Sequence, residues 1–398
     1  MDPHEAFDLA WLNSDRKPRY GHPRKEKLRL ADLFCGAGGL TLGVLEAARA
    51  LGIQVDPVLG ADLDPSVERA YRGNFVPACF VNRPLQELIN GDPDLVRIHE
   101  WEYGTETCLT REEITFRNEV LKDEDGIDFL VGGPPCQGHS NLNNHTRRED
   151  PKNQLYGRMA RFALVFKPRH ILIENVHGAA HDRGGIMDKT RAALNRLGYK
   201  IDTAIVKGEE IGVPQTRHRI FMIASRDRKP SIVNAVASHR VEEQRSFDWS
   251  QRGLQAGRNG SPLDIVTKPK PETAKRIAWL HQVDAADGKK KRYDLPNGLR
   301  PDCHQNDTHT YKSVYGRIRE DRPAPTITTG FTVMGQGRFV HPHEPRTLTP
   351  REGARIQFFP NWFFFGEDGG ISKKALVSLI GNAVPPKMAY VLALELLR

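Results

Sequence analysis

Short apolar runs alternate with segments of helical spacing over the first 226 residues, and this alternation restricts the fold more than any other feature. The runs 28–34 (LRLADLF), 57–64 (PVLGADLD) and 168–176 (PRHILIENV) have the length and composition of buried strands. The segments 40–52 and 65–75 place apolar residues three and four positions apart, as amphipathic helices do. Strands that alternate with helices predict an α/β fold with a mostly parallel sheet covered on both faces.

The rest of the chain is less regular. Residues 101–126 are highly charged and predict a surface insertion between two strands, and residues 227–345 are rich in Pro, Gly, Lys, Arg and His. The formal net charge of +8 and the pI near 9.2 favour a polyanionic partner such as nucleic acid. No uninterrupted run of 18 apolar residues and no basic-then-apolar leader is present, so neither a membrane segment nor export is predicted.

One of the five cysteines stands in a restricted frame, GGPPCQGHS at 132–140. Prolines before Cys136 fix their own backbone angles, while the flanking glycines let the loop turn. A thiol is mostly protonated near neutral pH, so a nucleophile needs a neighbour that favours the thiolate. Most cysteines only pack, and Cys35 is expected to do so. We interpret Cys136 as a candidate nucleophile; with no Cys-x-x-Cys pair, and no standard spacing in CHQNDTH at 303–309, no metal site is predicted.

Glycines follow the first predicted strand in DLFCGAGG. Gly36, Gly38 and Gly39 lack side chains, so a ligand can approach the backbone closely there. The spacing departs from Gly-x-Gly-x-x-Gly, which disfavours a dinucleotide enzyme without excluding it. Asp62, at the end of the second strand, is placed to accept hydrogen bonds from the ribose of a nucleoside-containing cofactor. A tight turn that binds nothing is the alternative.

Polar side chains also mark two later strands. Glu174 ends the apolar run HILI, where a carboxyl group can act as a proton donor or serve as a buried structural acid. Arg217 and Arg219, in QTRHR, precede the next strand, and alternation predicts that they lie on one side. Guanidinium groups suit a carbonyl oxygen or a phosphate, although two alternating arginines are also typical of a solvated face.

Together, DLFCGAGG, GGPPCQG, ENV, QTRHR, TPREGARIQFFP and GNAVP resemble, in this order, the motif set of the DNA (cytosine-5)-methyltransferases. The resemblance covers about residues 28–225 and 347–398. It implies a Rossmann-like α/β catalytic domain that binds S-adenosyl-L-methionine, with a smaller, irregular target-recognition domain inserted before the C-terminal motifs. The implied division is a basic N-terminal arm (1–27), the first part of the catalytic domain (28–226), the target-recognition domain (227–346) and C-terminal motifs that return to the catalytic domain (347–398).

The resemblance also implies roles for single residues. Cys136 would add to carbon 6 of a flipped-out cytosine, Glu174 would protonate ring nitrogen 3, and Arg219, supported by Arg217, would hold the ring carbonyl. The implied cofactor-binding residues are Phe34, Gly36, Gly38, Gly39, Asp62, Leu63, Gly133, Pro135, Asn382 and Val384. Leu63 departs from the larger apolar group usual there, and His139 replaces an aromatic residue. No acidic residue in 78–88 matches the one that reads the adenine amino group.

The resemblance implies double-stranded DNA as substrate, with a cognate restriction endonuclease as a partner, or an orphan enzyme without one. A monomer in the cytoplasm, associated with the nucleoid in a bacterium, is expected. Two alternatives stay open: a tRNA cytosine-5 methyltransferase and a catalytically inactive DNA-binding relative. The basic segment after QTRHR favours duplex DNA, and the presence of Cys136, Glu174 and both arginines argues against an inactive protein.

Overall fold

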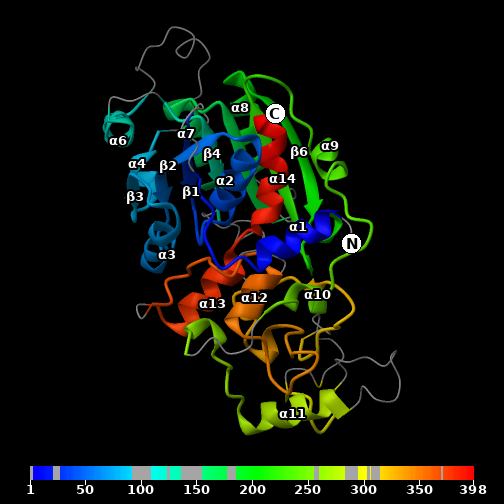
Figure 1. Ribbon diagram of the computed structural model, residues 1–398. Helices are drawn as coiled ribbons and strands as arrows, with labels where there is room; N and C mark the ends of the chain where they lie inside the picture. Colours follow the sequence, from blue (N-terminus) through cyan, green and yellow to red (C-terminus); the bar gives the residue numbers. More distant parts are fainter. Residues whose placement is uncertain are drawn as a thin grey trace. The chain divides into compact units, whose positions relative to one another are not determined.

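The computed structural model describes residues 3–20, 27–91, 109–122, 126–135, 155–176, 185–254, 260–282, 295–302, 305, 314–368 and 371–398 (Figure 1). The chain forms two compact units. Unit 1 comprises Met1–Lys17, Gly208–Arg217 and Val241–Ala383, and unit 2 comprises Pro18–Lys207, His218–Arg240 and Val384–Arg398. These units do not share the boundaries expected near 226 and 346, because residues 347–383 group with 241–346. The division of the chain by function therefore stays a prediction.

Unit 2 contains a seven-stranded sheet in the order β3-β2-β1-β4-β5-β8-β6. Strands β1 to β5 are parallel, whereas β8 runs antiparallel to both of its neighbours, β5 and β6. The strands are β1 (Lys27–Leu33), β2 (Gln54–Ala61), β3 (Cys79–Val81), β4 (Phe129–Gly132), β5 (His170–Val176), β6 (Lys200–Lys207) and β8 (His218–Ser225). The predicted α/β class with a mostly parallel sheet is confirmed.

Helices cover this sheet on both faces. On one face, α14 packs along α2 so closely that a Cβ atom on Gly43 would lie 2.5 Å from the Cβ of Ala389. The last helix thus packs beside α2, the helix that follows the first glycine turn. The helices of unit 2 are α2 (Gly39–Leu51), α3 (Pro65–Phe75), α4 (Leu85–Leu88), α6 (Arg111–Leu121), α7 (Gly157–Phe166), α8 (Ile186–Arg196), α9 (Ile232–Ala237) and α14 (Pro386–Leu397).

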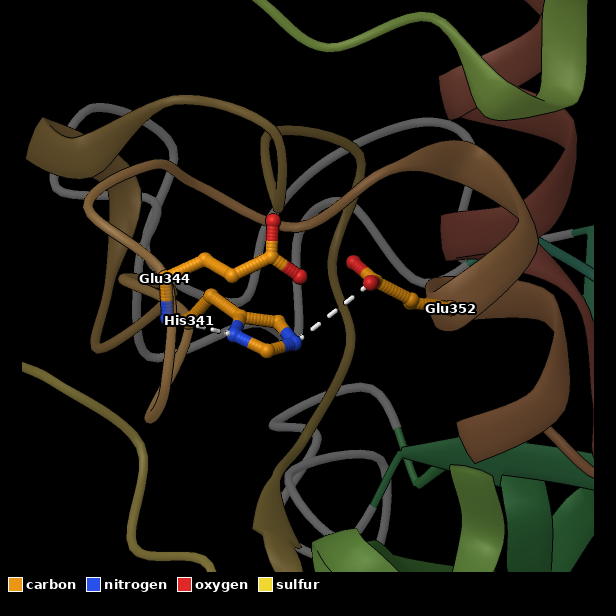
Figure 2. A group of neighbouring side chains, drawn as sticks. All are labelled: His341, Glu344 and Glu352. Atoms are coloured by element: carbon orange, nitrogen blue, oxygen red, sulfur yellow. Dashed lines mark hydrogen bonds and ion pairs between the residues drawn. The ribbon is translucent and has the colours of Figure 1, made fainter. Parts of the chain in front are cut away.

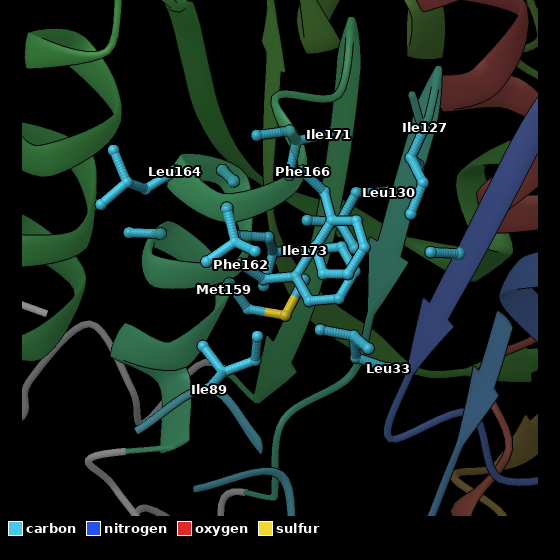
Figure 3. Packing of buried hydrophobic residues seen from close by; sticks show 14 of the residues in the cluster. Leu33, Ile89, Ile127, Leu130, Met159, Phe162, Leu164, Phe166, Ile171 and Ile173 are labelled. Atoms are coloured by element: carbon cyan, nitrogen blue, oxygen red, sulfur yellow. The ribbon is translucent and has the colours of Figure 1, made fainter. Parts of the chain in front are cut away.

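A large hydrophobic core of unit 2 lies between the sheet and α7 (Figure 3). Leu33, Leu130 and Ile173 point from three neighbouring strands toward Phe162 and Phe166, whose rings stack with centroids 4.2 Å apart. Alternate residues of each strand enter this core because side chains alternate between the two faces of a sheet. The core holds the strands in a fixed register, and it therefore also fixes the residues that follow their carboxyl ends.

Within the surface insertion expected at 101–126, residues 111–121 form a helix between β3 and β4 that has one buried face. These residues form α6, which buries Phe116 and Val120 and begins with a capping box between Thr110 and Glu113. Glu113 is fully buried and pairs through both carboxylate oxygens with Arg161, at 2.8 and 2.6 Å. The helix could not be recognised from its many charged residues, because the partner that allows Glu113 to be buried, Arg161, lies 48 positions away in the sequence.

Unit 1 has few strands and several short helices. Its elements are α1 (Pro3–Leu12), η4 (Gly208–Ile211), β7 (Gln215–Thr216), α10 (Phe247–Gln251), η5 (Pro262–Asp264), α11 (Pro271–Gln282), β9 (Ala324–Pro325), η8 (Met334–Gln336), α12 (Pro350–Ile356) and α13 (Lys373–Asn382). The buried Arg355 joins several of these segments by donating to the carbonyl oxygens of Leu12, Ser250 and Arg252. The expected basic arm, residues 1–27, includes the helix α1.

One stretch of the described chain, Lys373–Leu397, is long and apolar enough by composition to cross a membrane. It consists of two helices, α13 and α14, separated by residues 383–385, and 78% of its most apolar window is buried within the protein. Core helices of water-soluble proteins pass the same test, so this stretch is weak support for a membrane segment.

Candidate active site at the carboxyl edge of the sheet

Five neighbouring strands of unit 2 end in one row. The register pairs Leu33 with both Ala61 and Gly132, Ala61 with Val81, and Gly132 with Ile173. The residues that come next on each strand line the carboxyl edge of the sheet in the order Asn82, Asp62, Phe34, Gly133 and Glu174. Ligands of open α/β sheets bind at this edge, where the strand order reverses. Four of these five residues were predicted from the sequence.

The glycine turn after β1 adopts backbone angles that favour glycine. Gly36 and Gly38 have φ values of 49° and 84°, and Gly38 caps α2 in the left-handed region. A Cβ atom on Gly38 would lie 2.3 Å from the Phe75 ring, whereas one on Gly36 would have no atom of the described residues within 4 Å. The backbone at Gly36 thus faces open space that a ligand can approach. Gly39 begins α2, and Phe34 precedes the turn with a positive φ of 57°.

Asp62 and Asn82 add polar groups beside this turn. One carboxylate oxygen of Asp62 accepts the Gly36 N–H at 3.0 Å, and the other accepts the Asp64 N–H at 3.0 Å. Each oxygen keeps further acceptor capacity for a ligand hydroxyl. Burial raises the pKa of Asp62, while these backbone N–H groups act to lower it. The half-buried Asn82 donates to the Asp62 carbonyl at 2.8 Å, and Leu63 is 56% exposed.

Glu174 and Arg219 form an ion pair at the other end of the row. The Arg219 Nε lies 2.8 Å from Glu174 Oε1, and the two side chains are 16% and 11% exposed. Antiparallel pairing places Arg219 opposite Val176, so β8 begins at the edge where β5 ends. A Cβ atom on Gly133 would lie 3.5 Å from Glu174 Oε2, so this carboxyl group contacts the segment that continues through Pro135.

Cys136 and His139 lie outside the described residues, as do the residues up to 154. Gly133 and Pro135, which lead into that segment, are half-buried at the end of β4. The two cysteines described as free are Cys35 and Cys79. Burial raises the pKa of the Cys35 thiol, and the nearby Asp32 and Asp62 raise it further. This fits the expected packing role of Cys35, because only the thiolate is a good nucleophile.

Three predicted residues are not among the strand ends that form this row. Arg217, in unit 1 between β7 and β8, is buried and donates to the Ile327 carbonyl at 3.2 Å. Its expected action together with Arg219 stays a prediction. Asn382 is exposed at the end of α13, also in unit 1, and Val384 is buried in unit 2 just before α14. Their places in a cofactor pocket likewise stay predictions.

Asn82 is the residue that the sequence analysis missed. It follows β3, a strand of only three residues that was not predicted, and its side chain stands one strand beyond Asp62. The sequence contains a signal for it, because the stretch 78–88 is where the resemblance places an acidic residue that reads adenine. An asparagine also offers an acceptor oxygen, so Asn82 can take that place without a carboxylate.

Unit 1 holds one further cluster of possible ligand atoms among the described residues (Figure 2). His341, Glu344 and Glu352 point toward one another, with one ligand atom of each within 4.8 Å of the others. Arg346 donates to both oxygens of both carboxylates at 2.7 to 2.9 Å. Glu352 also closes a capping box with Thr349 at the start of α12. A metal ion would have to displace this guanidinium, so the cluster is best explained as a structural ion-pair network.

Comparisons with known proteins identify a family and several similar chains. A family model described as C-5 cytosine-specific DNA methylase matches residues 28–398. The chain is 40% identical over 395 residues to the Type II methyltransferase M1.BsuMI of Bacillus subtilis (strain 168), covering 99% of this chain and 86% of that protein. It is 28% identical to the Type II methylase M.HgiDII of Herpetosiphon aurantiacus, covering 92% and 94% of the two chains.

A solved structure supports the fold. The crystal structure of a putative DNA modification methyltransferase encoded within an E. coli prophage superposes with a TM-score of 0.61 at 24% identity. The match covers 93% of this chain and 98% of that chain. The Rossmann-like arrangement implied by the motifs is therefore shared with a protein of known structure.

Proposed function

Because the chain belongs to the family of C-5 cytosine-specific DNA methylases, we propose that it methylates carbon 5 of a cytosine within a specific duplex DNA sequence, using S-adenosyl-L-methionine. The row at the carboxyl edge of the sheet is the observation that most supports this proposal. It places groups suited to a nucleoside, Asp62 and Asn82, in line with the ion-paired carboxyl of Glu174.

The residues after β1, β2 and β3 fit the proposed cofactor. The open backbone at Gly36 allows close approach, the spare acceptor capacity of Asp62 suits ribose hydroxyls, and the exposed Leu63 offers an apolar contact. The side-chain NH₂ group of Asn82 already donates to the Asp62 carbonyl. The side-chain oxygen of Asn82 is therefore suited to accept a hydrogen bond from the amino group of adenine. When bound, S-adenosyl-L-methionine supplies an electrophilic methyl group on a sulfonium.

The cytosine ring needs activation because carbon 5 is a poor nucleophile. In the proposed mechanism the Cys136 thiolate adds to carbon 6, and electron density moves from the double bond toward carbon 5 and the ring nitrogen. Glu174 holds or donates a proton at nitrogen 3, and Arg219 fixes the carboxyl group and donates to the ring carbonyl. After carbon 5 is methylated, removal of its proton re-forms the double bond and expels the thiolate.

The target base must leave the duplex for this chemistry, because its carbon 6 is covered by stacking. We assign recognition of the DNA sequence to the basic, irregular segment 227–346, where arginine and lysine side chains can contact phosphates and guanine edges. Relatives named Type II methyltransferases support a role in protecting DNA beside a restriction endonuclease. A cytoplasmic monomer is the expected working form.

A methyl-transfer assay tests this function. The purified protein is incubated with tritiated S-adenosyl-L-methionine and either genomic duplex DNA or unmodified tRNA. Incorporation into DNA, with bisulfite sequencing showing 5-methylcytosine at one recurring sequence, is the expected result. Incorporation into tRNA alone would favour the RNA enzyme, and binding of DNA without any incorporation would favour the inactive relative. Either result would contradict the proposal.

A further inference from the structure

Asp32 is a buried carboxyl group directly below the glycine turn, and none of the steps above uses it. It is fully buried in β1, between Gly60 of β2 and Val131 of β4. Its neighbours Ala31 and Leu33 enter the core under α7, so Asp32 faces the opposite side of the sheet, toward α2. A carboxyl group in such a place is costly to ionise unless a partner compensates the charge.

Thr41 of α2 supplies the hydrogen bonds that this carboxyl group accepts in the described part of the chain, from its hydroxyl and from its backbone N–H. The Thr41 hydroxyl donates to Oδ2 at 2.7 Å, and the Tyr71 hydroxyl lies 2.8 Å from the Thr41 oxygen. The second oxygen, Oδ1, is buried and has no hydrogen-bond partner among the described residues. The carboxyl group is therefore poised between a neutral form, favoured by burial, and an anion that the Thr41 hydroxyl and backbone N–H support.

In the described part of the chain, the titratable groups that act most strongly on Asp32 are acidic. Asp62 from the end of β2, Cys35 from the turn and Tyr71 from α3 interact electrostatically with it. Burial is the largest cause that raises the pKa of Asp32, and the charge of Asp62 raises it too. The hydroxyl and backbone hydrogen bonds of Thr41 lower it, and the net result is a pKa of about 8. No cation is among these neighbours in the described part of the chain. A ligand that brings a positive charge to the turn would add an electrostatic interaction that favours the Asp32 anion.

We propose that Asp32 releases its proton when the sulfonium cofactor binds, and that its carboxylate then makes the site prefer this cation over the neutral thioether product. The inference rests on the proposed function. S-adenosyl-L-methionine and S-adenosyl-L-homocysteine share their amino acid and nucleoside groups and differ by the methyl group and one positive charge. Asp32 exchanges its proton with solvent, so no bond to the cofactor forms or breaks. Charge on Asp32 thereby discriminates substrate from product.

Proton release on binding measures this directly. Each ligand is titrated into the full-length protein without DNA, by calorimetry at pH 8 in two buffers of different ionisation enthalpy. Because Asp32 is about half protonated at that pH, the cofactor is expected to release up to about half a proton more than the product. The affinity ratio of cofactor to product should also rise between pH 7 and 9, by at most about tenfold per pH unit.

Two variants and one control separate this inference from a structural role. Asp32→Asn should release equal numbers of protons with both ligands. Thr41→Val removes the hydroxyl that stabilises the anion, so the maximum difference should move to higher pH. Asp56→Asn, a half-exposed carboxyl group of β2 paired with Lys27, should behave as the wild type.

Equal proton release by both ligands in the wild type would overturn the inference, as would a difference that persists in Asp32→Asn. If Asp32→Asn does not fold, an unshifted maximum in Thr41→Val overturns it instead. Failure of the wild type to bind either ligand would contradict the proposed function itself, which distinguishes the two failures.

Discussion

Replacing Glu174 by glutamine removes one carboxylate from the candidate active site with little change in size. Glu174 lies 2.8 Å from the Arg219 Nε, and both side chains are largely buried. A glutamine oxygen can still accept that N–H, so the variant loses the charged component of the interaction, which costs about 1 to 3 kcal/mol of folding stability. The protein should remain folded, with a lower melting temperature.

The catalytic loss should be larger than the loss of stability. The amide of Glu174→Gln cannot transfer a proton to ring nitrogen 3, and a positioned acid contributes about 100-fold to 10,000-fold to a rate. This range corresponds to about 3 to 5 kcal/mol of transition-state stabilisation. We expect methyl transfer to fall by this factor while the affinity for S-adenosyl-L-homocysteine stays within about twofold, because Asp62 and the glycine turn are untouched.

Single-turnover methyl transfer on a duplex that contains the recognised sequence measures the chemical step, and calorimetry measures the affinity. Glu68→Gln is the matched control, since Glu68 is a half-exposed residue of α3 that pairs with Arg72. This control should transfer methyl groups at the wild-type rate. A wild-type rate in Glu174→Gln would refute the acid role, and an equal loss of rate in both variants would point to a general effect on folding.

Three further changes test the fold that supports the site. Arg161→Met leaves the fully buried Glu113 carboxylate without its bidentate partner and should cost about 3 to 5 kcal/mol in urea unfolding; a loss under 1 kcal/mol would contradict this. Gly43→Leu should separate α2 from α14, where Ala389 leaves no room for a side chain, and should lower both melting temperature and cofactor affinity. Burial lowers the pKa of His170 to about 4, so the unfolded state alone binds a proton between pH 6.5 and 4. Stability should therefore fall as pH decreases through this window, by less in His170→Asn than in the wild type; equal pH dependence would exclude this cause.

Much of the candidate site could be predicted because parallel strands bring their carboxyl ends to one edge. Asp62, Phe34, Gly133 and Glu174 each follow an apolar run in the sequence, and the observed register places them in one row. Asn82 was missed because β3 has only three residues, too few for a recognisable apolar pattern.

Other features depend on contacts that local sequence does not contain. Arg217 and Arg219 were expected on one side by strand alternation, but β7 ends at Thr216 and β8 begins at His218. Arg217 therefore belongs to neither strand, and alternation does not apply to it. β8 is antiparallel to both β5 and β6. The composition of a strand does not determine its direction, so the sequence of β8 did not predict this.

Trapping of the covalent intermediate tests the central claim most directly. The protein is incubated with S-adenosyl-L-methionine and a duplex in which the target cytosine carries fluorine at carbon 5, so that the proton lost in the last step is absent. The account predicts an adduct whose intact mass equals protein plus duplex with one methyl group gained and the thiol hydrogen lost, and its absence in Cys136→Ser. Methylation of unmodified DNA without any adduct, or an adduct that persists in Cys136→Ser, would contradict it.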